Sequence, residues 1–279
     1  MARLISIDPL PHEGEGLGEN ARSRLDSKAS SLVSVTGALD ARIGAAGARV
    51  RAKAPLELRG PFPGASYYLR NTTAGVFGGD VYEVDVTSAA GSTVRVASGS
   101  ATKVYAGDGR RSSLTVRLTV EPGATLRWGP HATIVQAGAS YRQATAVSVA
   151  RGGRALLGEV LVLGRPAHGE RFDFQRLESR LNVTLDGVEV YNEAYSLRPG
   201  PDLVASMAGR AVLASVYAIG FKAAEAAPHL ELALAGESLA GWSELPNGAG
   251  LVVRGLFDAL SAGQALVERV MGLGVCSDR

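Results

Sequence analysis

Short segments of alternating apolar and polar residues, separated by glycine turns, run from about residue 34 to residue 197 and constrain the fold more than any other feature. Residues 80–88 read DVYEVDVTS, residues 92–100 read STVRVASGS, and residues 112–120 read SSLTVRLTV. A period of two residues is typical of strands that bury one face. The 35 glycines, an unusually large share of 279 residues, supply the tight turns that many short strands need. The sequence therefore predicts a mainly-β protein.

A faint internal repeat adds an architecture to this prediction. Three times, at a spacing of roughly thirty residues, a strand enters a glycine turn and a second strand leaves it; the turns contain Gly91, Gly123 and Gly152. A single hairpin of this kind cannot bury its own apolar face, so neighbouring units must stack. We expect layered sheets in a β-helix-like stack.

The C-terminal part of the sequence follows a different pattern. Residues 250–257 (GLVVRGLF) predict a strand, and Leu260, Gln264, Val267 and Met271 then recur at helical spacing up to the glycine at 272. A strand followed by a helix is expected to close the chain. Residues 1–30 show no sustained period and predict a loose N-terminal extension, which leaves residues 31–279 as a single domain.

Composition narrows the classes of function. A formal net charge of +2 gives no electrostatic reason to expect nucleic acid or an anionic membrane as a partner. Cys276 is the only cysteine, so neither an intrachain disulfide nor a cluster of thiolate ligands can form. We find no apolar core of a secretory signal and no run of about 18 apolar residues, which favours a cytoplasmic protein without membrane spans.

Familiar catalytic motifs are not found. The segment GVFGGD (residues 75–80) lacks the Lys-Ser or Lys-Thr of a phosphate-binding loop and precedes a strand rather than a helix, so taken alone it favours a turn. No permanent zinc or nickel site is expected, because the histidines are scattered; they are His12, His131, His168 and His229.

Several carboxylates lie within apolar strand patterns and are more informative: Asp80, Glu159, Glu170 and Glu193. Burying an unpaired carboxylate costs several kcal/mol, so such residues are usually paired or functional. Two interpretations stay open at this point. The carboxylates either form structural salt bridges, for which Arg165 and Arg171 are natural partners, or belong to a polar path through the interior.

The order of the motifs resembles that of the urease accessory protein UreD family, called UreH in some bacteria. The likeness begins with residues 74–107, where the Gly78-Gly79-Asp80 turn is followed by the segment containing Lys103 and Tyr105. It continues through EPGATLRWGPHATIVQAGASYR (residues 121–142), GEVLVLGRPAHGERF (158–172), RLESRLNVTLDGVEVYNEAYSL (176–197) and the closing segment 250–271. The third block carries the family motif residues Gly164, Arg165, Gly169 and Glu170.

The ordered blocks cover roughly residues 35–272 and are more specific together than any one of them. Departures from the family pattern, such as Ala74, Ala106 and Arg127, indicate a divergent member.

The resemblance implies a scaffold rather than an enzyme. Such a protein binds UreF and, through it, the GTPase UreG on the urease apoprotein, and helps to insert nickel into the urease active site. The resemblance is also compatible with a dimer of the accessory complex. Contact with UreF is implied for residues 250–272, although this helix would equally well pack on the core. We also expect exposed apolar surface to make the isolated protein poorly soluble.

Polar residues in the interior of the family's body are thought to form a water-filled route for the metal. The positions implied for this metal passage are Asp80, Thr102, Lys103, Glu159 and Glu193. No cofactor is expected to stay bound, since nickel is only in transit. On this hypothesis the glycines bend the chain so that Asp80 points inward toward the passing cation.

Two other classes of function remain as alternatives. A β-rich ligand-binding module without a metal role, for instance for carbohydrate, would need exposed aromatic platforms, whereas aromatic residues make up only 6% of the chain. A metallohydrolase would need a histidine-rich cluster.

Overall fold

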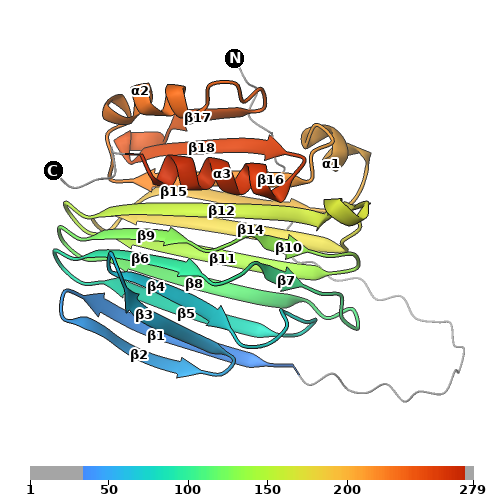
Figure 1. Ribbon diagram of the computed structural model, residues 1–279, viewed down its shortest axis with the longest axis horizontal. Helices are drawn as coiled ribbons and strands as arrows, with labels where there is room; N and C mark the ends of the chain where they lie inside the picture. The colour runs from blue at the N-terminus through green and yellow to red at the C-terminus, as the bar shows by residue number, and fades with distance from the viewer. Residues whose placement is uncertain (1–33, 274–279) are drawn as a thin grey trace, which may run out of the picture.

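Two β-sheets form the body of the protein (Figure 1). The computed structural model describes residues 34–273, so the predicted extension at residues 1–30 and Cys276 lie outside the described residues. Strands are the dominant elements, as the alternating pattern predicts.

Sheet A has seven strands in the order β15-β14-β11-β8-β5-β1-β2. Its inner strands β1, β5, β8, β11 and β14 run parallel, whereas β2 and β15 pair antiparallel at the two edges. The strands span β1 Thr36–Gly44, β2 Gly47–Lys53, β5 Val81–Ser88, β8 Ser112–Val120, β11 Ser140–Val149, β14 Arg176–Leu185 and β15 Val188–Leu197.

Sheet B follows the order β17-β18-β16-β12-β9-β6-β4-β3, and three short strands, β7, β10 and β13, branch from it. Its strands span β3 Leu56–Phe62, β4 Ser66–Asn71, β6 Thr93–Ser98, β7 Thr102–Val104, β9 Thr125–Gly129, β10 Thr133–Val135, β12 Arg154–Arg165, β13 Glu170–Arg171, β16 Val212–Ile219, β17 Ala240–Glu244 and β18 Gly250–Phe257. The helices are α1 Pro201–Ser206, α2 Ala223–Ala233 and α3 Leu260–Met271, with short 3₁₀ turns at Pro166–His168 and Pro246–Gly248.

The chain crosses from sheet A to sheet B at three glycine turns, between β5 and β6, between β8 and β9 and between β11 and β12, which confirms the predicted β-helix-like stack. Gly91, Gly123 and Gly152 all adopt left-handed φ values, between 67° and 72°. Their turns lie one above the other: the Thr125 amide donates to the Ser92 carbonyl at 2.8 Å, and the Arg154 amide donates to the Ala124 carbonyl at 2.9 Å. The repeat in the sequence therefore corresponds to the repeating unit of the β-helix-like stack.

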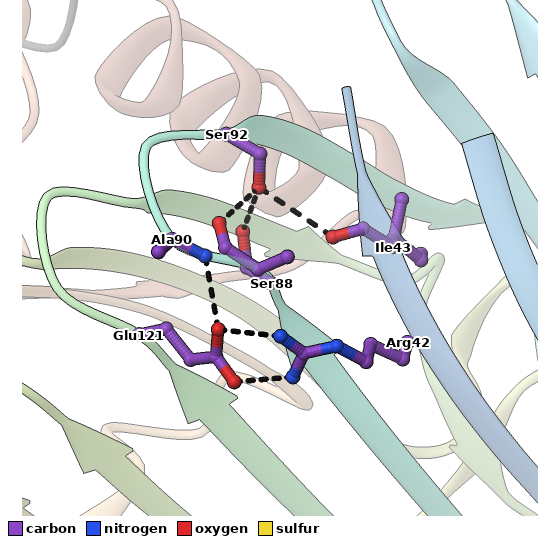
Figure 2. Close-up of polar contacts among 7 residues, drawn as sticks. Arg42, Ile43, Ser88, Ala90, Ser92 and Glu121 are labelled. Atoms are coloured by element: carbon purple, nitrogen blue, oxygen red, sulfur yellow. Dashed lines mark hydrogen bonds and ion pairs between the residues drawn. The ribbon is translucent and has the colours of Figure 1, made fainter. Parts of the chain in front are cut away.

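Polar side chains tie neighbouring turns together (Figure 2). The Ser88 and Ser92 hydroxyls lie 3.1 Å apart, and Ser92 also reaches the Ile43 carbonyl of β1. Glu121, on the next turn, accepts a hydrogen bond from the Ala90 amide at 3.0 Å and a bidentate ion pair from Arg42. The turn at Gly91 is thus fixed to the turn at Gly123 and to strand β1.

Two apolar clusters hold the layers together, one between the sheets and one between sheet B and the helices α2 and α3. Strand β12 serves both, because Leu157 and Leu161 face sheet A while Leu156 and Val160 face α3. Full burial of each leucine contributes about 1.5–3 kcal/mol. Helix α3 approaches β12 closely because position 158 is glycine: a Cβ there would lie 2.5 Å from Val267 Cγ1.

The predicted C-terminal strand and helix correspond to β18 and α3. Among residues 34–273, no helix combines the length and the apolar character needed to cross a bilayer.

Candidate functional site

A row of polar residues interrupts the apolar core between the two sheets. On β12, Glu159 stands at the inward position between Leu157 and Leu161. The register of sheet B places Glu159 opposite Ser215 of β16, and Ser215 opposite Arg254 of β18. All three side chains share one level and one face of the sheet, because directly paired residues in a ladder point the same way.

Sheet A contributes a matching row. Gln143 of β11 pairs with Ser179 of β14, which pairs with Tyr195 of β15. Gln143 joins the two rows, since its amide donates to the Glu159 carboxylate across the gap and to Ser179 Oγ at 3.1 Å. A polar layer therefore crosses the body at the level of Glu159.

Four residues of this layer line a cavity of about 470 Å³ between the sheets: Gln143, Glu159, Ser179 and Tyr195. Four of the five predicted passage residues line it: Thr102, Lys103, Glu159 and Glu193. Lys103 is exposed, and the other three are half-buried. The fifth residue, Asp80, is not in the lining.

Glu159 is the most unusual group of the cavity. Burial raises the pKa of its carboxyl from 4.5 to about 7; the hydrogen bond from Gln143 opposes this rise, and the negative charge of Glu193 adds to it. No basic side chain among residues 34–273 forms an ion pair with Glu159. Tyr141, also in the lining, is fully buried and its hydroxyl has no hydrogen-bond partner within the described part of the chain. The cavity therefore holds a carboxyl group without a counter-ion beside an unused hydroxyl.

Glu193 lies in a different environment. It accepts hydrogen bonds from the hydroxyls of Tyr191, at 2.7 Å, and Tyr217, at 3.0 Å, and it forms an ion pair with Arg254. Burial, together with the charge of Glu193, raises the pKa of Tyr191 to about 12. The charge of Glu193 is thus compensated directly by Arg254, whereas Glu159 feels Arg254 only at a distance and forms no ion pair with the described residues.

Asp80 holds a turn of the backbone. Its side chain is only 3% exposed, and it accepts hydrogen bonds from the Val35 amide at 2.9 Å, the Phe77 amide at 2.9 Å and the Tyr82 hydroxyl at 3.1 Å. Both carboxylate oxygens are therefore in use. The loop that Asp80 fixes contributes Gly75 and Val76 to the cavity wall. Asp80 therefore holds this part of the wall in place without facing the cavity itself.

The glycines of the same turn allow two backbones to touch. A Cβ on Gly78 would lie 2.7 Å from the Cα of Gly107, and Gly79 has a φ of 89°. The Phe77 ring stacks on Tyr105 with 4.8 Å between ring centres. The turn and the segment around Tyr105 are far apart in sequence, and they pack as one unit because two glycines face each other.

The remaining motif residues form the connection after β12. Arg165 Nε donates to Glu170 at 2.7 Å, and Glu170 also accepts a hydrogen bond from the Ala137 amide at 2.8 Å. Gly164 and Gly169 have φ values of 115° and 76°, which favour glycine. These residues close a tight connection and do not line the cavity. Of the two arginines expected to pair with carboxylates, Arg165 contacts Glu170.

Arg171, the second arginine expected to pair with a carboxylate, contacts Asp258 at 3.2 Å.

Sequence reasoning did not identify several residues of the polar layer and of the cavity lining around it: Tyr141, Gln143, Ser179, Tyr195, Tyr217 and Arg254. The sequence contained a signal for some of them. A polar residue at the inward position of an otherwise apolar strand is not explained by core packing and therefore indicates a polar site in the interior. Among residues 34–273, no three His, Cys, Asp or Glu side chains form a group that could hold a metal ion.

Comparison with known proteins gives a consistent result. The family model described as UreD urease accessory protein matches residues 36–276. A urease accessory protein UreD of Haloarcula marismortui is 33% identical over 216 residues, which are 75% of this chain and 72% of the relative. The UreD of Cupriavidus pinatubonensis is 38% identical over 71% of this chain and 66% of its own length, and that of an Anaeromyxobacter species is 35% identical over 64% and 62%.

Proposed function

Because the chain belongs to the UreD family of urease accessory proteins, we propose that it helps to insert nickel into urease by passing the ion through the cavity between its two sheets. In this proposal the protein is a scaffold and not an enzyme. It acts with UreF, with the GTPase UreG and with the urease apoprotein, and the nickel ion is its cargo.

The observation that carries the proposal is Glu159, a carboxyl group without a counter-ion that faces an internal cavity. With a pKa of about 7, both the protonated and the ionised form of the group are populated near neutral pH, and an arriving cation favours the ionised form. Carboxylate, amide and hydroxyl oxygens bind nickel more weakly than imidazole or thiolate groups, so the ion moves on. The Gln143 amide oxygen and the Tyr141 hydroxyl, which line the same cavity, are candidates to share the ion with Glu159.

The other predicted passage residues take different roles in the proposal. Thr102 and Lys103 lie on β7, at the exposed side of the cavity, where an ion would enter or leave. Glu193 contributes less to cation binding than Glu159, because Arg254 already neutralises it. Asp80 acts indirectly, by ordering the loop that forms one wall.

For UreF, the apolar side of α3 is not free. Gly263, Leu266, Val267 and Val270 are buried against sheet B, so a contact at residues 250–272 would use the polar side of the helix.

The test is urease maturation in cells that express urease together with all accessory proteins. Glu159→Ala is expected to lower the nickel content and the specific activity of purified urease several-fold, while the accessory complex still co-purifies. Glu83→Gln, on the exposed outer face of β5, is the control and should leave both values unchanged. Normal nickel content of urease matured with the Glu159→Ala protein would refute the passage through this cavity.

A further inference from the structure

The outer face of sheet B is covered by helices only in part. Helix α3 packs on β12, β16 and β18, and Figure 1 shows β9, β6, β4 and β3 without a helix in front of them. The outward side chains of these four strands include Arg59, Arg70, Arg95 and Arg127, together with Phe62 and Tyr68. We call this set the arginine face.

The arginine face exposes aromatic surface. Phe62 is 47% and Tyr68 39% exposed, and their rings meet edge to face with 5.3 Å between centres. Within residues 34–273, the only other large aromatic side chain exposed to this degree is Phe77, which stacks on Tyr105. Exposed tyrosine next to arginine is the composition typical of the energetic centre of protein interfaces.

The charge of this face is unbalanced. Glu57 pairs with Arg59 at 2.6 Å and with Arg70 at 3.1 Å, so one carboxylate serves two guanidinium groups. The Arg95 side chain makes no hydrogen bond or ion pair with any residue of the described range, and the sheet register places it beside Arg127. An excess of positive charge on a flat surface favours a partner that carries carboxylates.

On the outer face of sheet A several arginines are paired, although Arg49, Arg51, Lys53 and Arg142 form no ion pair with the described residues. Arg117 pairs with Asp85 at 3.1 Å, and Arg111 pairs with Glu178 at 2.7 Å. No large aromatic side chain is exposed on its described strands. The combination of aromatic exposure and unbalanced arginines is therefore particular to one half of one sheet.

A hollow of about 220 Å³ lies where the arginine face meets the end of α3. Tyr68, Arg95, Arg127 and Met271 line it, with Glu268 as its one carboxylate. An apolar side chain with carboxylates on the side of the arginines would therefore fit its chemistry. Pro130 and His131 line both this hollow and the inter-sheet cavity. A partner seated in the hollow would thus be separated from the cavity by a single wall.

That wall is well ordered. The His131 amide donates to Ser98 Oγ at 2.8 Å, and the His131 ring lies 2.6 Å from the Gln264 amide of α3. Because Pro130 and His131 lie between the cavity and the hollow beside α3, a partner bound in the hollow would sit next to the proposed ion path.

We propose that the arginine face and its hollow dock a protein partner through an acidic surface with an apolar side chain at its centre. The role of this partner rests on the proposed function: because the hollow lies beside the cavity, the partner would be the protein that hands nickel over or receives it. The docking itself can be tested without any nickel measurement.

The experiment measures the affinity of the purified chain for UreF, UreG and urease apoprotein, each alone and in their joint complex, at low and high salt. Arg95→Glu and Tyr68→Ala are expected to weaken one of these affinities by about tenfold or more, in line with the loss of a central interface residue. The affinity of the wild-type chain for that partner should fall as salt increases.

Arg142→Glu is the matched control, because Arg142 is exposed on the outer face of β11 and its side chain likewise makes no hydrogen bond or ion pair with the described residues. It should bind like the wild type. Unfolding midpoints of all variants show whether each one is folded.

Two results would overturn the docking proposal alone: partners that bind the folded Arg95→Glu and Tyr68→Ala variants as tightly as the wild type, or a short DNA duplex or anionic vesicles as the only probes whose binding depends on Arg95. A wild-type chain that binds none of the three proteins would refute the partners of the proposed function as well.

Discussion

Replacing Glu159 by glutamine should remove a pH-dependent loss of stability. In the folded protein the pKa of Glu159 is about 7, whereas its ordinary value is 4.5, and burial is the main cause. The folded state therefore holds the proton more tightly than the unfolded chain does. The stability that this gives is fully present below about pH 4.5 and is lost as the pH rises through about 7.

The size of the effect follows from the same two values. Moving a pKa from 4.5 to about 7 is equivalent to about 3 kcal/mol. Because Glu159 lines a cavity large enough for water, we expect about 2 kcal/mol to be measured. Glutamine has nearly the same shape and cannot ionise, so the Glu159→Gln variant should gain this amount relative to the wild type between about pH 5 and about pH 9.

Urea denaturation followed by circular dichroism at several pH values measures this difference directly. Other titrating groups cancel when the two proteins are subtracted, and Glu83→Gln on the outer face of β5 should show no such trend. A difference between Glu159→Gln and wild type that stays constant within about 0.5 kcal/mol over this range would refute the reasoning, since it would mean that Glu159 is as well solvated as a surface carboxylate.

Two further substitutions test the packing around the cavity. Gly78→Ala should lower the free energy of unfolding by about 1–3 kcal/mol, because its methyl group meets the backbone of Gly107, whereas Gly99→Ala, with only a distant side-chain neighbour, should have little effect; equal losses in both variants would contradict this. Arg254→Ala should destabilise the protein by about 1–2 kcal/mol by leaving Glu193 without its cation, a modest value because the arginine side chain is 37% exposed. Adding Glu193→Gln should recover part of that loss, and a double variant less stable than the single one would show that the pair does not act in this way.

The alternating strands and the stacking of turns could be predicted from the sequence because each depends on local patterns. Gly91, Gly123 and Gly152 mark the turns, and the strands between them show their buried side by their period. The sequence does not reveal which strand joins which sheet, because this depends on how far each turn rotates the chain.

Glu159 could be identified as an interior carboxylate because its neighbours on both sides are apolar. Its partner Gln143 could not, because the contact crosses from one sheet to the other. Arg254 was missed for a related reason: an arginine within a strand resembles an outward residue, and only its register with Ser215 places it on the inner side. Asp80 shows the limit most clearly, since one of its hydrogen-bond donors, the Val35 amide, lies 45 positions away.

The antiparallel edge strand β2 has a consequence for self-association. A stack of parallel strands ends in an unpaired backbone, which can add a strand from another molecule and so grow into a fibre. Here the terminal strand runs against the direction of the stack, and it carries Arg49, Arg51 and Lys53 on one exposed side. Like charges would face each other if two such edges met, so this end of the solenoid is closed to polymerisation by repulsion.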